Sequence, residues 1–592
     1  MNARVVMAAP WTRHYDPEVP PSLAPYPAKT LVDFLRESAA AQPSAPAILF
    51  KGNRISHADL DRLSDRFATS LVEAGVEKGD RIALLLPNCP QFLIAEIGAW
   101  KAGATVLLLN PLYTGAELRE PLKAAGIEVI VTLTPFYKRV KDLQRDTKVR
   151  HVIATSIKEY LPPLLRTLFT LFKEKKDGHR IDLQSGDAWF QDCLKANASA
   201  ANQSTRRDSG TGSVVRDFSR APKPDDPAIM LMSGGTTGSP KAVVGLHRCL
   251  VAAGMQLNLW LHPPKHAPND VALVPLPLFH VYACVGVQSH SIISRTPMAL
   301  VPNPRDIDDL LKTIETVKPT LFSAVPALFI ALLNHPKVRS QSVDFSSIRA
   351  SFSGAAPLMA ATKAQFEELT GGRIVEGYSL TEAMMACVVN PLNGINKVGS
   401  VGIPLPDVEV AIVDADTGTT VLPNGETGEV ILRAPQLMEG YFNNAHETTR
   451  SLRVHPEPSS SGFGRGPWLH TGDLGYLDED SFLFIVDRQK DLIKTSGYQV
   501  WPREVEEVLA AHPSVREVGV AGIPDAVKGE VVKAWVVVRG GTQPTVDELR
   551  AYCREHLAPY KTPAQVEFRE SLPKTMTGKV LRRALVEEHK RA

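Results

Sequence analysis

The chain has few cysteines for its length and no excess charge of either sign. Its six cysteines are widely scattered and no two of them form a CxxC pair; they are Cys89, Cys193, Cys249, Cys284, Cys387 and Cys553. Disulfide frameworks and zinc sites need clustered cysteines, so this spacing argues against both and indicates a reducing compartment. The formal net charge of +2 gives no electrostatic reason to expect a nucleic-acid partner.

Long apolar runs are also absent. No stretch reaches the roughly 18 apolar residues that a membrane-spanning helix needs. We expect no signal peptide, because the apolar run from Val5 to Ala9 is short and Pro10 and Trp11 follow it at once. The final residues, His589 to Ala592, are not a peroxisomal address. We therefore expect a cytoplasmic protein.

What the sequence does contain is alternation of helix and strand signals, over the first 130 residues and again from Ala228 to about Gly377. Apolar runs such as Ala47 to Phe50 and Arg81 to Leu86 are typical of buried strands, and Ser56 is placed to cap an amphipathic helix. Such alternation predicts an α/β fold, with open, mostly parallel sheets covered by helices on both faces.

Three other segments depart from this pattern. Residues 195–227 are rich in small polar and charged residues, which predicts a flexible surface insertion. From Val401 to Leu432, short strands with turns predict a small β-rich, barrel-like subdomain. A last unit begins near Asp487, where a helix at Pro502 to Ala511 and a strand at Val531 to Val538 predict a small α+β domain.

The segment 161–176 is amphipathic and has two interpretations. Six apolar residues fall on one helical face and three lysines follow; they are Leu161, Leu164, Leu165, Leu168, Phe169, Phe172, Lys173, Lys175 and Lys176. The first interpretation is a short helix in the core or between domains. The second is an interfacial helix that makes weak peripheral contact with the inner face of a membrane.

A loop of glycines and hydroxyl side chains follows the strand-like run Ala228 to Met232. It reads Ser233-Gly234-Gly235-Thr236-Thr237-Gly238-Ser239-Pro240-Lys241. Glycines let a backbone approach a ligand closely, and successive backbone amides form a nest for anions. The hydroxyls and Lys241 add donors and a cation, so the loop predicts a phosphate site. It is not a Walker loop, because Ser239 and Pro240 stand where the second glycine and the lysine would be.

Five further motifs follow in order along the chain. They are Pro277-Leu278-Phe279-His280-Val281-Tyr282, Ser353-Gly354-Ala355-Ala356-Pro357, Gly377-Tyr378-Ser379-Leu380-Thr381-Glu382, Trp468-Leu469-His470-Thr471-Gly472-Asp473 and Asp487-Arg488-Gln489-Lys490-Asp491. The sequence Pro573-Lys574-Thr575-Met576-Thr577-Gly578-Lys579 stands near the end. With the phosphate loop, these motifs resemble the adenylate-forming (AMP-binding) superfamily over about residues 30–590. Ala242 is a mild departure, since relatives usually carry glycine there.

The resemblance implies a two-step ligase that uses ATP, Mg²⁺ and coenzyme A. A carboxylate first attacks the α-phosphate of ATP, and a thiol then displaces AMP. It also implies an N-terminal adenylation domain at residues 1–486, a hinge at 487–491 and a mobile C-terminal domain at 492–592. The large domain would combine two βα-layered subdomains with the β-rich one.

Carried over residue by residue, the resemblance also implies a site. ATP would contact Ser233, Gly234, Gly235, Thr236, Thr237, Gly238, Lys241, Ala355, Ala356, Pro357, Gly377, Tyr378, Ser379, Asp473 and Arg488. Magnesium would be held by Glu382 and Thr236, since Mg²⁺ prefers hard oxygen ligands. The catalytic residues would be Lys579, Glu382, Thr381 and Lys494. Lys490 would be the hinge pivot, and Gly497 and Tyr498 would face coenzyme A.

The acyl pocket implied by the resemblance contains His280, Val281, Cys284, Gly354 and Gly377, with His280 as a wall or gate. A carboxylate substrate is already ionised at neutral pH, so no general base is needed. Gly234 in the loop and the segment 157–176 resemble bacterial long-chain fatty acid–CoA ligases. The gating tryptophan that some of those relatives carry near Cys284 is absent here.

Several alternatives stay open from the sequence. Aryl-acid ligases of the coumarate type share every catalytic motif, and an acyl-AMP ligase would load a carrier protein in place of coenzyme A. A luciferase-like oxygenase has the same motifs, while a non-catalytic sensor would not need Glu382, Asp473, Arg488 and Lys579. A homo-oligomer is compatible with the sequence.

Overall fold

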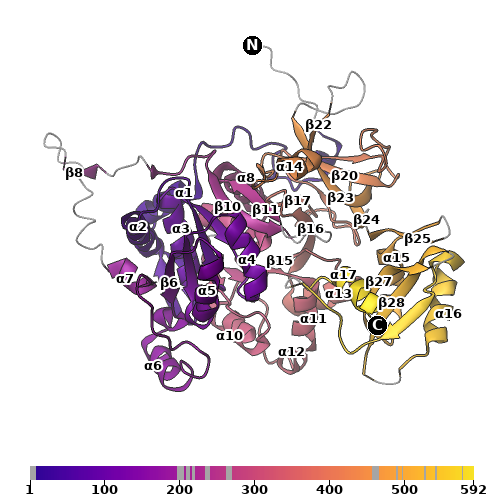
Figure 1. Ribbon diagram of the computed structural model, residues 1–592. Helices are drawn as coiled ribbons and strands as arrows, with labels where there is room; N and C mark the ends of the chain where they lie inside the picture. Colours follow the sequence, from indigo (N-terminus) through magenta and orange to yellow (C-terminus); the bar gives the residue numbers. More distant parts are fainter. Residues whose placement is uncertain are drawn as a thin grey trace, which may run out of the picture.

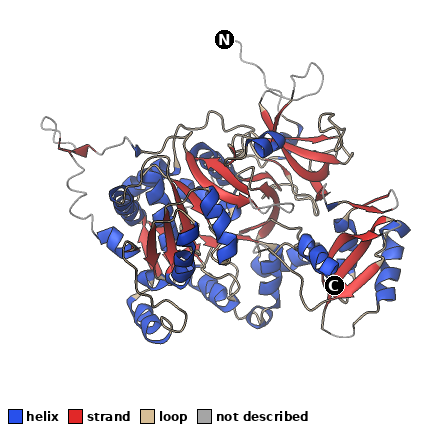
Figure 2. Cartoon of the chain, viewed as in Figure 1, coloured by secondary structure: helices blue, strands red, loops and turns tan. Residues whose placement is uncertain are grey.

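The computed structural model describes residues 9–195, 206–207, 214–215, 220–233, 241–261, 270–455, 466–488, 491–495, 498–525, 528–540, 543–575 and 578–591. Figures 1 and 2 show two large sheets covered by helices, a smaller β-rich unit and a C-terminal unit at one side. The predicted insertion at 195–227 and the phosphate-loop residues 234–240 lie largely or wholly outside the described residues.

The first large sheet has eight strands. In sheet order they are β21 (Gly440–Tyr441), β11 (Lys241–Leu246), β10 (Pro227–Ser233), β4 (Thr105–Leu108), β3 (Arg81–Leu85), β5 (Val129–Leu133), β6 (His151–Thr155) and β7 (Ala188–Trp189). The strands from β10 to β7 are parallel, and β11 and β21 extend the sheet antiparallel. The predicted phosphate loop stands between β10 and β11 in the sequence, and these two strands pair antiparallel.

The second large sheet has nine strands. In sheet order they are β18 (Ile403–Pro404), β17 (Met385–Val389), β16 (Arg373–Leu380), β15 (Ala350–Ser353), β14 (Leu321–Ala324), β12 (Ala272–Val274), β13 (Met298–Leu300), β1 (Pro46–Phe50) and β2 (Asn53–Ser56). Its centre, from β16 to β1, is parallel. The predicted α/β architecture is therefore confirmed.

Helices cover both sheets. They are α1 (Leu31–Ala41), α2 (His57–Glu73), α3 (Pro90–Lys101), α4 (Gly115–Ala124), α5 (Tyr137–Leu143), α7 (Phe190–Lys195), α8 (His247–Leu261), α9 (His290–Ser294), α10 (Ile307–Val317), α11 (Pro326–Asn334), α12 (Pro336–Arg339) and α13 (Ala360–Thr370), with a π-helical segment at Tyr282–Ser289. Every residue of α3 is buried, including Glu96, within a core cluster that contains residues of both sheets. As predicted, the hydroxyl of Ser56 caps α2.

The β-rich unit is antiparallel. It consists of β19 (Glu409–Val413), β20 (Gly428–Arg433), β23 (Pro467–Leu477), β22 (Leu452–Val454) and β24 (Leu483–Arg488), with α14 (Ala445–Ser451). The C-terminal unit contains β25 (Ile493–Thr495), β26 (Tyr498–Val500), β27 (Val515–Asp525), β28 (Gly529–Val538), β29 (Gln565–Phe568), α15 (Pro502–Ala511), α16 (Val546–His556) and α17 (Arg582–Arg591). Two core clusters of its own stabilise this α+β unit.

Helix α6 (Pro163–Phe172) contradicts one expectation. The core-helix interpretation of this segment is wrong, because α6 has no buried residue, and Leu164 and Phe172 are 71% and 70% exposed. It packs on the 3₁₀ turn at Ile157–Tyr160 and lies at the opposite end of the molecule from the C-terminal unit (Figure 1).

Two further features concern the cysteines and the helices. All six cysteines are free and buried. Among the helices of the described residues, none combines the length and apolar character needed to cross a bilayer.

Candidate active site

A cavity of about 300 Å³ lies between the second sheet, the β-rich unit and the C-terminal unit. Eight of the residues expected to form the site line it: Ala355, Ala356, Pro357, Gly377, Tyr378, Ser379, Asp473 and Lys579. Two of their motifs stand about 20 positions apart, the third follows more than 90 positions later, and Lys579 lies near the end of the chain. The fold therefore brings together residues that are distant in the sequence.

Strand pairing explains the first part of this convergence. Strands β15 and β16 are parallel neighbours with Ser353 opposite Glu376. Their carboxyl ends therefore meet at one edge, where the motif that follows β15 lies beside the motif that ends β16. Ligands in open α/β sheets bind at this edge. Ala355 adopts a positive φ of 68°, which turns the chain sharply at the cavity wall.

Tyr378 and Asp473 are joined directly. The Tyr378 hydroxyl donates a hydrogen bond to an Asp473 oxygen at 2.6 Å, and both side chains are buried. Asp473 reaches the cavity from β23, where its backbone lies opposite that of Arg488 in β24. The side chain of Arg488 lies outside the described set. A carboxylate can only accept hydrogen bonds, so Asp473 presents an acceptor to any hydroxyl-bearing ligand.

Tyr441, which the sequence motifs did not include, contacts both Glu382 and Lys241. The Tyr441 hydroxyl donates to Glu382 at 2.9 Å, while the Lys241 ammonium lies 5.1 Å from the Tyr441 ring centroid and pairs with Glu447. This follows from the pairing of β11 with β21. Burial, followed by the charge of Glu382, raises the pKa of Tyr441 above its ordinary value, so the phenol stays protonated and can donate.

Sequence comparison decides the family. Residues 35–442 match the AMP-binding enzyme family, and residues 504–579 match the AMP-binding enzyme C-terminal domain. This chain belongs to the AMP-binding enzyme family. The resemblance inferred from its motifs is confirmed.

Relatives of this AMP-binding enzyme cover nearly all of it. It is 39% identical to a long-chain-fatty-acid–CoA ligase of Bacillus subtilis over 98% of both chains. It is 32% identical to 4-coumarate–CoA ligase 1 of Solanum tuberosum over 90% of this chain and 88% of that one. Among solved structures, ATP-bound MatB from Rhodopseudomonas palustris superposes with a TM-score of 0.77 at 27% identity, over 95% of this chain and 99% of that one.

The two lysines predicted to be catalytic, Lys579 and Lys494, are placed differently in this AMP-binding enzyme. Lys579 lines the cavity, and its backbone N–H donates a hydrogen bond to the Thr575 hydroxyl at 3.1 Å. Lys494 is exposed and is not among the residues that line the cavity. Tyr498 is 56% exposed and stacks on Tyr560, with centroids 4.6 Å apart.

Arg582 is a feature of the site that sequence reasoning missed. Its guanidinium pairs with Glu506 at 2.7 Å and with Asp487 and Asp491 at 3.0 Å each. Burial would lower the pKa of Arg582, but these three carboxylates raise it above its ordinary value. Nothing in the sequence distinguishes Arg582 from the adjacent Arg583, which forms only an exposed ion pair with Glu587. Arg582 thus ties the C-terminal unit to the predicted hinge.

Most of the residues expected to form the acyl pocket do not line this cavity. Gly377 lines the 300 Å³ cavity, whereas His280, Val281, Cys284 and Gly354 do not. Burial lowers the pKa of His280 to about 4, so its imidazole is neutral near pH 7. Tyr282, which was not predicted as a pocket residue, lies beside Gly354, where an added Cβ would be 3.2 Å from its ring. Its ring also lines a second, apolar cavity of about 20 Å³.

Some predicted residues receive no structural description. Gly234, Gly235, Thr236, Thr237, Gly238, Lys490 and Gly497 lie outside the described residues. Ser233 is described and buried at the end of β10, and Thr381 and Glu382 are half-buried just after β16. The anchor points of the phosphate loop, Ser233 and Lys241, are paired neighbours on β10 and β11.

Proposed function

We propose that this AMP-binding enzyme is a fatty acid–CoA ligase. It activates a medium- or long-chain fatty acid with ATP to acyl-AMP and pyrophosphate, and then transfers the acyl group to coenzyme A with release of AMP. The observation that carries this proposal is that Tyr378, Asp473 and Lys579 line the same cavity. The 39% identity to a long-chain-fatty-acid–CoA ligase over 98% of both chains supports the substrate class.

In the first half-reaction, a carboxylate oxygen attacks the α-phosphorus of ATP and pyrophosphate leaves. Tyr378 stacks on the adenine, and Asp473 accepts hydrogen bonds from the ribose hydroxyls. Negative charge grows on the phosphate oxygens, and the nearby cations and donors stabilise it. In this proposal Lys579 binds the carboxylate and the α-phosphate, while Lys241, Thr381, Arg488 and the loop residues 233–238 hold the phosphates.

Glu382 offers a carboxylate oxygen to a magnesium ion beside Tyr441. It accepts a hydrogen bond from the Tyr441 hydroxyl at 2.9 Å, which orients the carboxylate. We assign Glu382 and Thr236 as ligands, because carboxylate and hydroxyl oxygens suit Mg²⁺. When bound, the ion neutralises charge on the phosphates of ATP.

For the second half-reaction, we propose that the domain at residues 492–592 rotates about the hinge at 487–491, with Lys490 as pivot, relative to residues 1–486. Rotation removes Lys579 from the cavity and brings Lys494, Gly497 and Tyr498 to it. The contrast between Lys579 in the cavity and the exposed Lys494 supports an adenylation orientation of this structure. Such domain movements commonly separate the steps of multi-step enzymes.

A panel of acids tests the substrate. The purified protein would receive ATP, Mg²⁺, coenzyme A and one acid at a time, from butyrate to oleate and including coumarate and benzoate, with acyl-CoA and AMP measured by chromatography. We expect the highest kcat/KM for fatty acids of medium or long chain. Turnover of aryl acids alone would contradict the proposal and favour a coumarate-type ligase. Acyl-AMP without acyl-CoA would indicate transfer to a carrier protein.

We also propose that the enzyme works in the cytoplasm and makes peripheral contact with the inner face of the membrane through 161–176. Five exposed large apolar side chains gather on the ten-residue helix α6: Leu164, Leu165, Leu168, Leu171 and Phe172. The exposed lysines 173, 175 and 176 follow directly. An apolar face flanked by cations suits a bilayer with anionic headgroups, because the face enters the acyl boundary while the lysines meet the phosphates.

Vesicle sedimentation tests this contact. We expect binding to phosphatidylglycerol-containing vesicles that weakens roughly tenfold in a Leu164→Glu/Leu171→Glu variant. Leu112→Glu is the matched control, since Leu112 is 54% exposed in the segment between β4 and α4. Equal binding by the α6 variant and the wild type would end the proposal. If the α6 variant and the wild type had different sedimentation coefficients in the absence of vesicles, this would instead show that α6 joins two copies of the chain.

A further inference from the structure

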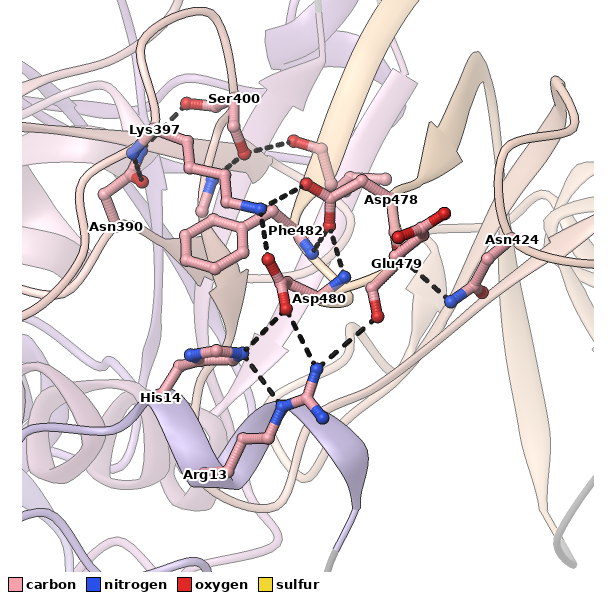
Figure 3. A network of polar contacts seen from close by, with 12 residues as sticks. Arg13, His14, Asn390, Lys397, Ser400, Asn424, Asp478, Glu479, Asp480 and Phe482 are labelled. Atoms are coloured by element: carbon pink, nitrogen blue, oxygen red, sulfur yellow. Dashed lines mark hydrogen bonds and ion pairs between the residues drawn. The ribbon is translucent and has the colours of Figure 1, made fainter.

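Lys397 occupies a bridging position between two carboxylates. Its ammonium lies 2.6 Å from Asp478 and 2.8 Å from Asp480, and it sits 4.6 Å from the centroid of the Phe482 ring (Figure 3). Both aspartates belong to the turn between β23 and β24. The contacts therefore connect the loop after β17 to the β-rich unit.

The loop that starts at Lys397 forms part of the cavity wall. Gly399 and Val401 line the same 300 Å³ cavity as Tyr378 and Asp473. Ser400 between them is buried, and its hydroxyl donates to the Leu483 carbonyl at 2.8 Å. The loop is thus fastened at both ends, by ion pairs at Lys397 and by hydrogen bonds to the start of β24 at residues 400–401.

A second cation reaches the same aspartate from the N-terminal segment. Arg13, in the 3₁₀ turn at Pro10–His14, contacts Asp480 at 3.0 Å, and His14 lies 3.7 Å from it (Figure 3). Just downstream, the Tyr15 hydroxyl donates to the Pro404 carbonyl at 2.6 Å. This segment precedes residues 35–442, the part that matches the family. It contacts Asp480, which also pairs with Lys397, and the strand β18 that follows the loop.

We propose that Lys397 is a positioning residue for nucleotide binding, with Asp480 and Arg13 as its supports. Lys397 does not line the cavity, so it acts through the backbone of the 397–401 wall. A wall displaced by a fraction of an ångström fits the nucleotide less well, and binding energy depends steeply on such placement. The proposal rests on the proposed function in one respect: the cavity must bind ATP.

Direct measurement of ATP binding tests the positioning role of Lys397 separately from the proposed function. ATP would be titrated by calorimetry into the wild type, Lys397→Met, Lys397→Arg and Arg13→Ala, without acid or coenzyme A. We expect Lys397→Met to raise the ATP Kd and the KM for ATP roughly five- to tenfold, with kcat and the KM for the fatty acid within about twofold. Lys397→Arg should restore most of the affinity, because it keeps the charge between both aspartates.

The matched control is Lys337→Met, which breaks an exposed ion pair of the same 2.6 Å length to Asp308. Failure of the wild type to bind ATP would overturn the proposed function. Wild-type binding with an unchanged Kd in Lys397→Met would overturn the positioning role. So would an equal rise in both KM values together with a fall in kcat and in Tm, since that pattern describes general destabilisation.

Discussion

The hydroxyl of Tyr441 donates a hydrogen bond to the carboxylate of Glu382 across 2.9 Å. Tyr441 lies on an edge strand of the first sheet and Glu382 follows a strand of the second, so this bond joins the two halves of the large N-terminal unit at the candidate magnesium site.

Replacing Tyr441 with Phe tests what this bond does. The ring and its packing remain, but Glu382 loses the donor that orients it. We expect kcat/KM for acyl-AMP formation to fall roughly tenfold, which corresponds to loss of one hydrogen bond to a charged group. The Mg²⁺ concentration for half-maximal pyrophosphate release should rise. Tyr137→Phe, which removes a similar bond to Asp187 in another part of the fold, should change neither.

Asp473→Asn exchanges a pure acceptor for a group that also donates. If Asp473 accepts the ribose hydroxyls, the amide can satisfy fewer of them, and the ATP Kd should rise by roughly 10- to 100-fold. Calorimetric titration with ATP measures this. Asp416→Asn is the control, because Asp416 is exposed on the same β-rich unit. Equal affinities of Asp473→Asn and wild type would remove Asp473 from the nucleotide site.

Lys579→Ala should separate the two half-reactions. Acyl-AMP formation, followed as exchange of pyrophosphate into ATP, should fall by at least about 100-fold, because the cavity loses the cation that we propose binds the carboxylate and the α-phosphate. Conversion of supplied acyl-AMP and coenzyme A into acyl-CoA should persist, and Lys494→Ala should show the reverse pattern. Lys590→Ala, exposed on α17, should affect neither step. Equal loss of both steps in Lys579→Ala would contradict domain rotation.

Arg582→Gln should weaken the tie between the hinge and the C-terminal unit. The change leaves three buried or half-buried carboxylates facing one another, and breaking a buried pair typically costs about 3–5 kcal/mol. We expect a lower Tm, and acyl-AMP formation should fall more than the thioester step. Arg583→Gln should lower stability by less than about 1 kcal/mol, since its pair with Glu587 is exposed. Equal losses of stability in Arg582→Gln and Arg583→Gln would contradict a stabilising link between the hinge and the C-terminal unit through Arg582.

Glu96 should make stability depend on pH. Burial raises its pKa to about 8 from 4.5, partly offset by the hydrogen bond from Gln288. The native carboxyl therefore holds its proton up to about pH 8, whereas the unfolded chain loses it above about pH 4.5. Unfolding releases a proton within this window, so stability contributed by Glu96 declines as pH rises through it. Glu96→Gln should flatten the profile of Tm against pH, while Glu37→Gln at the surface should not.

Much of the site could be predicted from sequence, because its residues stand in short motifs whose chemistry is local. Gly377, Tyr378 and Asp473 were expected together, and they line one cavity. The supporting residues could not be found that way. Tyr441, Arg582 and Lys397 stand in segments with ordinary composition, and their importance comes from pairing of distant strands.

Helix α6 shows a different limit of prediction from sequence. Periodicity correctly predicted an apolar face over Leu164 to Phe172, but it cannot tell what covers that face. Only the packing of the remaining chain decides whether such a helix is buried, and here it leaves the helix exposed. The fold class was safer to predict, because alternation of strands and helices leaves few ways to build a parallel sheet.

The burial of all six cysteines has a chemical consequence under the proposed function. An acyl-adenylate is a strong acylating agent that reacts with thiolates. Burial raises the pKa of Cys89 and Cys387 to about 12 and that of Cys284 well above its ordinary value, so these thiols stay protonated. The enzyme's own sulfur atoms therefore do not compete with the incoming cosubstrate, and self-acylation, which would consume both intermediate and catalyst, is suppressed.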